Sequence, residues 1–236
     1  MKTLLKKSAK IIREKIKRML IPYAKYRIRH LDPKEAEVGA LVDFVFDKFA
    51  GLIAPAQVMS EIVSLAELVK KLKPKTVLEI GTASGGTLFL FSRLADSDAK
   101  IISIDLPGGE FGGGYPEWKM DLYKNFSLPF QKLYLLRGDS HLVSVKEQVK
   151  KIIGTAPVDF LFIDGDHTYE GVKKDFNMYS PLVKKGGIIA FHDIARHPPE
   201  KDCNVRRFWE EIKKEDDEEF IENPNQKWAG IGIYRP

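Results

Sequence analysis

Residues 76–87, with the sequence TVLEIGTASGGT, constrain the fold more than any other part of this chain. An apolar run of strand length contains Glu79, small residues follow in a tight turn, and a helical pattern begins near Gly86. Such a strand-turn-helix unit is typical of an open α/β sheet, which binds ligands at the carboxyl ends of its strands. Because Gly81 and Gly85 are four apart, the pattern is E-x-G-x-x-x-G. It differs from the dinucleotide pattern G-x-G-x-x-G, and no Gly-Lys-Ser/Thr follows, which argues against a phosphate loop. A corner whose glycines serve packing alone is the alternative.

Short apolar runs alternate with helical patterns through most of the chain. The runs lie at residues 76–80, 100–104, 132–136, 159–163 and 187–191, and the helical patterns lie around residues 86–94, 117–125, 144–153 and 169–182. This alternation predicts parallel strands joined by crossover helices. A later helix around 205–214 and two short runs, 219–221 and 230–234, predict a terminal hairpin.

The region before the first strand has the apolar spacing of helices. Apolar residues recur at helical intervals over residues 38–46 and 58–69, with a break at 51–55. Asp32-Pro33 predicts a helix start. We therefore expect a basic helical arm at 1–30, packing helices at 31–75 and a ligand-binding domain at 76–236.

Charge is distributed unevenly along the 236 residues. The net charge is +5, but residues 1–30 hold eleven Lys or Arg and a single acidic residue, Glu14, so the remainder is acidic. Apolar residues from Leu5 to Leu20 follow one helical face, and Pro22 predicts the end of that helix. Three partners stay open for this arm: the body or a second subunit, an anionic membrane surface, and nucleic acid, which is least favoured because aromatic residues are not interleaved.

Composition also limits the compartment and the class of protein. A single cysteine, Cys203, argues against a disulfide framework and a cysteine-rich zinc site, and it suits a reducing cytoplasm. No apolar run approaches the roughly 18 to 20 residues of a membrane-spanning helix. We expect a cytoplasmic protein without a secretory signal.

Polar residues end or follow each of the first five predicted strands. They are Glu79; Asp105; Asp139 with Ser140; Asp164 to His167; and His192 with Asp193. Buried carboxylates are costly unless they are paired or liganded, so packing alone does not explain this arrangement. Asp105 lies 20 residues after Gly85, where an acid can accept hydrogen bonds from a ribose diol.

Together these residues resemble the class I S-adenosylmethionine-dependent methyltransferases over about residues 53–236. The resemblance implies a Rossmann-like, doubly wound, mostly parallel seven-stranded sheet with an antiparallel last strand, and S-adenosylmethionine as cofactor. The residues it assigns to the cofactor are Glu79, Gly81, Thr82, Ser84, Gly85, Gly86, Thr87, Asp105, Asp139, Ser140 and Asp164. This cofactor has a methionyl carboxylate that helix-start N–H groups can meet, and no pyrophosphate.

A narrower resemblance is to the metal-dependent O-methyltransferases, including the branch similar to cephalosporin hydroxylase. It rests on FIDGDHTY at residues 162–169 and GGIIAFHD at 186–193. It implies a divalent cation on Asp164, His192 and Asp193, although His192 stands where that branch has an acid. Imidazole suits Mn²⁺, Fe²⁺ or Zn²⁺ better than Mg²⁺. The alternative is that His192 and Asp193 orient the substrate or each other.

The implied reaction is an in-line methyl transfer in which positioning supplies most of the acceleration. A metal on Asp164 and His192 lowers the pKa of the acceptor hydroxyl, and His167 serves as general base. A loop-ordering role is the alternative for His167. The glycine- and aromatic-rich segment 107–129 resembles a substrate lid, unless Trp118 and Tyr123 pack a helix on the sheet.

The predicted function is methylation of a hydroxyl on a small molecule of sugar or natural-product type, in a homo-oligomeric enzyme. A nicotinamide-dependent oxidoreductase is disfavoured because the dinucleotide glycine pattern is absent. A nucleic-acid methyltransferase anchored by the arm predicts binding that falls steeply with salt. A non-catalytic assembly subunit predicts cofactor binding without turnover.

Overall fold

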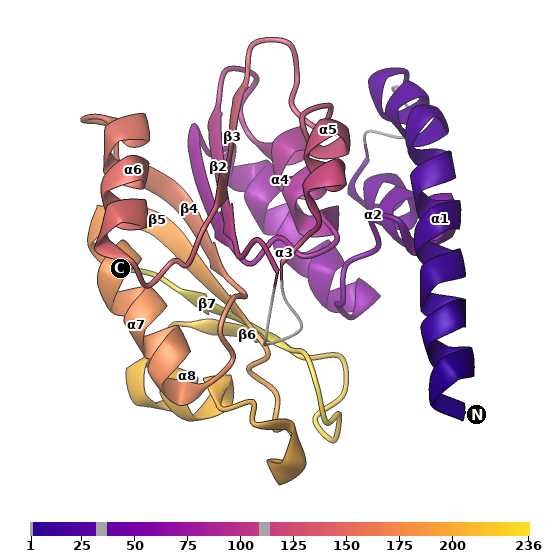
Figure 1. Ribbon diagram of the computed structural model, residues 1–236. Helices are drawn as coiled ribbons and strands as arrows, with labels where there is room; N and C mark the ends of the chain where they lie inside the picture. The colour runs from indigo at the N-terminus through magenta and orange to yellow at the C-terminus, as the bar shows by residue number, and fades with distance from the viewer. Residues whose placement is uncertain (1, 32–36, 109–113) are drawn as a thin grey trace.

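The computed structural model describes residues 2–31, 37–108 and 114–236, with side chains of residues 2–11 and 13 left out. Within these residues the strands form one seven-stranded sheet in the order β3-β2-β1-β4-β5-β7-β6 (Figure 1). The strands are β1 (Thr76–Ile80), β2 (Lys100–Asp105), β3 (Lys132–Arg137), β4 (Val158–Ile163), β5 (Val183–His192), β6 (Glu218–Phe220) and β7 (Ile231–Tyr234). The first five are parallel, and β7 is antiparallel to both β5 and β6. The predicted fold class and the terminal hairpin are confirmed.

Helices cover both faces of the sheet. They are α1 (Lys2–Arg29), α2 (Val38–Asp47), α3 (Met59–Leu72), α4 (Gly86–Leu94), α5 (Met120–Tyr123), α6 (Val143–Ile153), α7 (Tyr169–Tyr179) and α8 (Val205–Ile212), with short 3₁₀ turns η2 (Phe49–Gly51), η3 (Glu117–Lys119), η4 (Ser180–Leu182) and η5 (Pro199–Lys201). Figure 1 shows α6, α7 and α8 on one face, and α2 to α5 on the other with α1 outside them. Alternate residues of β1 join the two resulting cores: Val77 packs on one side, and Leu78 and Ile80 on the other.

The order of the strands places a crevice at the carboxyl end of β1. The chain runs from β1 to β2 and β3 on one side, then returns so that β4 and β5 lie on the other side. The crossovers therefore diverge next to β1, which is the topological switch point where open α/β sheets bind ligands.

The helix α1 continues through Pro22 to Arg29, so the predicted end of the helix at Pro22 is wrong. A proline inside a helix costs about 3 kcal/mol because it removes a hydrogen bond and clashes with the preceding turn. Here the turns after Pro22 bury Ala24 and Ile28 completely against the core, which offsets that cost. The carbonyl of Ile28 also accepts a hydrogen bond from Arg93 Nη2 at 2.9 Å.

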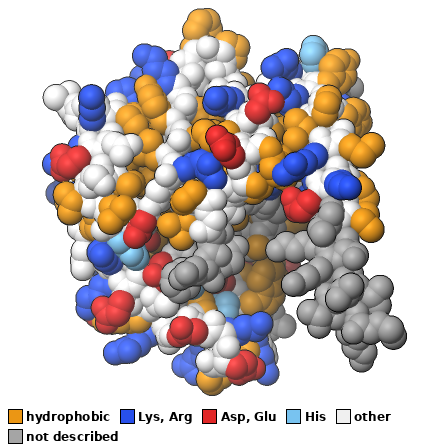
Figure 2. Space-filling model, in the orientation of Figure 1, with side chains coloured by type: hydrophobic (Ala, Val, Ile, Leu, Met, Phe, Trp, Pro, Cys, Tyr) orange, Lys and Arg blue, Asp and Glu red, His pale blue; other side chains and the backbone are white. Residues whose placement is uncertain are grey.

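Most of the apolar stripe that the sequence places on α1 faces outward over its described part, although Leu20 packs against the core. Ile12, Ile16 and Met19 are 57%, 47% and 80% exposed, while Ala24 and Ile28 make the buried contact. Figure 2 shows hydrophobic and basic side chains together over this helix. A contact of α1 with a second subunit or a membrane stays a prediction. Within the described residues, no helix has both the length and the apolar character needed to cross a membrane.

Other differences are local. The strand β5 begins at Val183, four residues before the predicted run, because Val183 pairs with Val158 across an irregularity in the register. The predicted helix over 117–125 is split into η3 and α5. Asp32 and Pro33 lie outside the described residues.

The buried Glu61 of α3 holds the connection between β6 and β7 in place. Its carboxylate accepts hydrogen bonds from the backbone N–H groups of Gly230 at 2.8 Å and Glu222 at 3.0 Å, and from Gln226 Nε2 at 2.6 Å. Glu61→Ala leaves these donors unpaired, so we expect a loss of about 2–3 kcal/mol in the free energy of unfolding by urea denaturation. Glu67→Ala, an exposed change on the same helix, is the control and should stay within about 0.5 kcal/mol. An equal loss of unfolding free energy in the two variants would contradict this role of Glu61.

Candidate active site

The carboxyl edge of the parallel strands opens into a cavity of about 730 Å³. This volume is in the range of small-molecule and cofactor sites. Its lining comes from the ends of five strands and includes Ile80, Gly81, Ala83, Asp105, Leu106, Gly138, Asp139, Ser140, His141, Asp164, Gly165, Asp166, His167, His192, Asp193 and His197. The polar residues that the sequence places after each strand are therefore brought together.

The predicted cofactor residues divide into two groups. Gly81, Asp105, Asp139, Ser140 and Asp164 line the cavity, as do the predicted catalytic and metal residues His167, His192 and Asp193. Glu79, Thr82, Ser84, Gly85, Gly86 and Thr87 are outside that lining, and they shape the loop that forms its wall.

Glycine is required in this loop because other backbone comes very close. Gly81 has φ +92°, and a Cβ there would lie 1.9 Å from the carbonyl oxygen of Asp164. A Cβ on Gly86 would lie 2.4 Å from the carbonyl oxygen of Ile53. Because both residues lack a Cβ, the turn after β1 can pack between β4 and the segment before α3.

Asp105 fastens the loop to the end of β2. Its Oδ2 accepts hydrogen bonds from the N–H groups of Thr82 at 3.1 Å and Ala83 at 2.7 Å, and its Oδ1 accepts one from Leu106 at 2.8 Å. Burial raises the pKa of the Asp105 carboxyl, and these donors oppose the rise. Asp105 thus shapes the turn as well as lining the cavity.

Residues from the predicted lid lie beneath the loop. Tyr123 donates its hydroxyl to the carbonyl of Ala83 at 2.8 Å, and the buried Lys119 donates to the carbonyls of Leu52 at 3.0 Å and Ser84 at 3.3 Å. Burial lowers the pKa of Lys119 to about 8. Tyr115 and Tyr123 are buried too, so these two aromatic residues support the loop and offer no free ring surface. Trp118 is partly buried against the same core. Gly109, Phe111, Gly112 and Gly113 lie outside the described residues.

A pair formed by an acid and a histidine, which the sequence analysis missed, lies near the end of β3. His141 lines the cavity, and its Nε2 is 3.3 Å from Oδ1 of the fully buried Asp175 on α7. Its backbone N–H also donates to Asp139 Oδ1 at 2.8 Å. The helical spacing that buries Asp175 gives no sign of this pairing.

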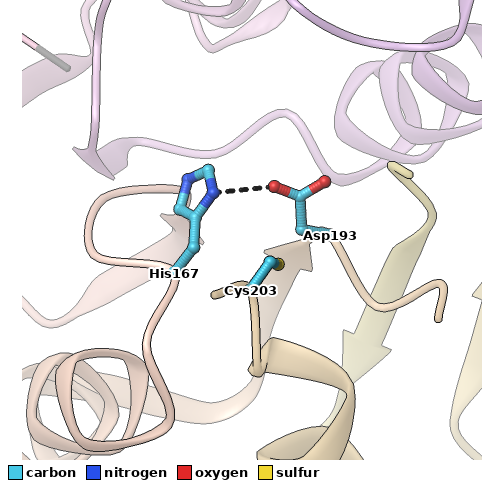
Figure 3. Close-up of side chains that lie close together, drawn as sticks. All are labelled: His167, Asp193 and Cys203. Carbon is cyan, nitrogen blue, oxygen red and sulfur yellow. Dashed lines mark ion pairs between the residues drawn. The ribbon is translucent and has the colours of Figure 1, made fainter. Parts of the chain in front are cut away.

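The ends of β4 and β5 carry a cluster of two carboxylates and three imidazoles. Asp164 Oδ1 is 3.0 Å from His192 Nδ1 and 3.4 Å from His167 Nε2. Asp193 Oδ2 is 2.9 Å from His167 Nδ1, the pair drawn in Figure 3, and Asp193 Oδ1 is 3.1 Å from His197 Nε2. Gln57, missed by the sequence analysis, donates to Asp164 Oδ2 at 3.0 Å.

The charges of this cluster are balanced by protons in the metal-free protein. Burial would raise the pKa values of Asp164 and Asp193, but the neighbouring imidazolium groups outweigh it and lower both. Burial opposes protonation of His192, yet the two carboxylates raise its pKa to about 10. The pKa of His167 is raised in the same way. Because a general base must be neutral, His167 can serve as one only after its proton has been displaced.

Two sets of side chains in this cluster fit a divalent cation. They are Asp164, His192 and Asp193, and His167, Asp193 and Cys203, each with ligand atoms within 4.8 Å of one another. His192 Nε2 is buried and lacks a hydrogen-bond partner among the described residues. The predicted metal ligands are therefore close together, and Cys203 is an addition that the sequence did not indicate.

Comparison with known proteins assigns the family. Residues 78–194 match the family described as a methyltransferase domain. An uncharacterized protein of Acanthamoeba polyphaga mimivirus is 35% identical over 126 residues, which cover 50% of this chain and 51% of that protein. Tapetum-specific methyltransferase 1 of Arabidopsis thaliana is 27% identical over 160 residues, which cover 67% of this chain and 64% of that protein. The chain thus spans about half to two thirds of the length of these relatives.

The fold agrees with this family. The O-methyltransferase from Bacillus cereus, solved as a complex with SAH, superposes with a TM-score of 0.58 at 18% identity over 91% of this chain and 97% of that one. Residues 78–194 therefore form a domain of the methyltransferase family, and the chain has the fold of that O-methyltransferase.

The carboxyl of Glu79, behind the loop, predicts a pH effect on stability. It is fully buried, accepts one hydrogen bond from Thr87 Oγ1 at 2.6 Å, and burial raises its pKa from 4.5 to about 8. Between those pH values the unfolded chain loses this proton and the folded chain keeps it. The free energy of unfolding should therefore fall with rising pH, with a contribution of about 1.4 kcal/mol per unit.

Glu79→Gln keeps an acceptor for Thr87 and removes the titration. Urea unfolding of the cofactor-free protein at several pH values from 5 to 8 should show that the variant lacks this slope. Parallel curves for the two proteins would contradict the buried, protonated state of Glu79.

Proposed function

We propose that this protein transfers a methyl group from S-adenosylmethionine to a hydroxyl group of a small molecule. The proposal rests on one observation: the Gly81 loop and Asp105 line the same cavity as the carboxylate-imidazole cluster of Asp164, His167 and Asp193. The loop and Asp105 suit a nucleoside and an amino-acid group. The cluster suits a hydroxyl that must lose a proton.

The residues that would hold the cofactor follow the strand order. Asp105 lies where a ribose would be recognised, Asp139 and His141 line the side for the adenine, and the turn from Gly81 to Ala83 lines the side for the methionyl group. When bound, the cofactor supplies an activated methyl group on a sulfonium. The carboxylates that line the cavity, among them Asp105 and Asp139, make the surroundings favourable for that positive charge.

The acceptor would lie against the ends of β4 and β5. Asp164 and Asp193 offer oxygens that accept a hydrogen bond from a hydroxyl and orient it toward the methyl group, which is the positioning that such a displacement needs. Asp164, His192 and Asp193 are the ligands predicted for a divalent cation, which would lower the pKa of the acceptor hydroxyl. His167, between both carboxylates, holds the proton in the metal-free state.

The cavity and the arm favour a small acceptor over nucleic acid. Two cations of α1 are directed at the body: Lys25 pairs with Asp121 at 2.8 Å, and Arg29 donates to Asn125 Oδ1 at 2.8 Å. They are thus less available to phosphates. The proposal includes an acceptor of the sugar or natural-product class, a homo-oligomeric state and a cytoplasmic location.

The test is transfer of a labelled methyl group from S-adenosylmethionine to a panel of small hydroxyl compounds, catechols and sugar nucleotides, with amines and RNA as competing acceptors. We expect a base-stable O-methyl ether, and Gly81→Ala should abolish both transfer and calorimetric binding of S-adenosylhomocysteine. The new Cβ at position 81 would lie 1.9 Å from the backbone carbonyl oxygen of Asp164. Gly154→Ala is the matched control, because Gly154 is also at positive φ but a Cβ there has nothing within 4 Å and adds only local strain. Transfer only to RNA or amines would contradict the proposal.

A further inference from the structure

Cys203 lies beside the acidic cluster although it is 36 residues away from His167 in the sequence. The backbone N–H of Asn204 donates to the carbonyl of His167 at 2.8 Å, which fastens the start of α8 to the loop after β4. Figure 3 shows the side chains of His167, Asp193 and Cys203 grouped together, from the β4 loop, the end of β5 and the segment before α8. Their ligand atoms all lie within 4.8 Å of one another.

The donors of this group differ from those of a magnesium site. A thiolate, an imidazole and a carboxylate are the ligands of zinc, and three protein ligands leave the fourth position of a tetrahedral ion open, as in catalytic zinc sites. Mg²⁺ prefers oxygen ligands, so a thiolate shifts selectivity toward Zn²⁺, Co²⁺ or Fe²⁺.

The surroundings of these ligands support them. A histidine that binds metal usually has its other ring nitrogen on a carboxylate. His167 Nδ1 faces Asp193, while its Nε2 is 3.4 Å from Asp164 Oδ1. Asp193 is oriented in turn by the N–H of Ala229, which donates to Oδ1 at 2.9 Å.

The second set of possible metal ligands, Asp164, His192 and Asp193, has weaker support of this kind. His192 Nδ1 faces Asp164 at 3.0 Å and Asp193 at 3.5 Å, so a metal on that nitrogen leaves only Nε2 for an orienting partner. That Nε2 is buried and has no hydrogen-bond partner among the described residues. The contrast favours the set that contains Cys203.

We propose that His167, Asp193 and Cys203 bind a zinc-class divalent cation, with Asp164 as a positioning residue behind His167. The inference rests on the proposed function, because it assigns the cation ligands of that same site. Binding releases the proton on His167 Nδ1 and the thiol proton of Cys203 to solvent. His167 is then a ligand, and its role as the general base predicted from sequence falls away.

Cobalt gives a direct test, because Cys203 is the only cysteine in the chain. Full-length protein is freed of metal with a chelator and titrated with Co²⁺. We expect a near-ultraviolet thiolate-to-cobalt band together with the visible bands of a tetrahedral ion. Cys203→Ser should abolish the near-ultraviolet band and weaken Co²⁺ binding about tenfold or more. His192→Gln is the matched comparison, and it should keep the band.

Three results would overturn the proposal: no Co²⁺ binding, binding without the thiolate band, or a band that His192→Gln removes. Thermal melting of each variant establishes that it is folded. Calorimetric titration of Cys203→Ser with S-adenosylhomocysteine separates this inference from the proposed function. Cys203→Ser should bind S-adenosylhomocysteine as tightly as the wild-type protein does. If the wild-type protein itself did not bind S-adenosylhomocysteine, the result would count against the methyltransferase proposal.

Discussion

The close approach between the end of β1 and its two neighbouring strands is the constraint on which the site depends. Gly81 N donates to the carbonyl of Ile104 at 2.9 Å, and Asp164 N donates to the carbonyl of Ile80 at 2.8 Å. The same turn gives two N–H groups to Asp105. Gly81 and the preceding Ile80 therefore join β1 to β2 and β4 at the point where the crossovers diverge. The acids at the ends of β2 and β4 face a common cavity because this junction is tight.

A second organising feature is the balance of charge at the ends of β4 and β5. Asp164 and Asp193 are held close together, and two anions in a poorly solvated place need compensation. In the metal-free protein that compensation is the protons of His167 and His192, whose pKa values are raised. A divalent cation bound by Asp193 and His167 can replace the proton of His167, so the same geometry accounts for the protonated state and for metal binding. Cation binding and acceptor activation are thus linked through Asp193, with Asp164 positioning His167.

The sequence was informative where local patterns decide structure. Five apolar runs, each ended by a polar residue, predict the parallel sheet and the placement of Asp105, Asp164 and Asp193 at one edge. It failed where distant contacts override a local rule. Pro22 stays inside α1 because residues beyond it are buried, and no spacing along the chain links Cys203 to His167.

The predicted lid at residues 107–129 is another feature for which the sequence alone was not sufficient. Glycine and aromatic residues suggest mobility and exposed rings, yet Tyr115 and Tyr123 are buried beneath the cofactor loop. Whether an aromatic residue covers a substrate or supports a loop depends on what packs around it. For the same reason, the pairing of His141 with Asp175 needs the fold, since α7 and the end of β3 meet only in three dimensions.

The most direct measurement of the central claim is a crystal structure of this protein with S-adenosylhomocysteine. We expect the ribose at Asp105, the adenine toward Asp139 and His141, and the homocysteine group along the turn from Gly81 to Ala83. The sulfur should point toward Asp164 and Asp193, where the acceptor would lie. Ligand bound outside this cavity, or an empty cavity at saturating concentration, would contradict it.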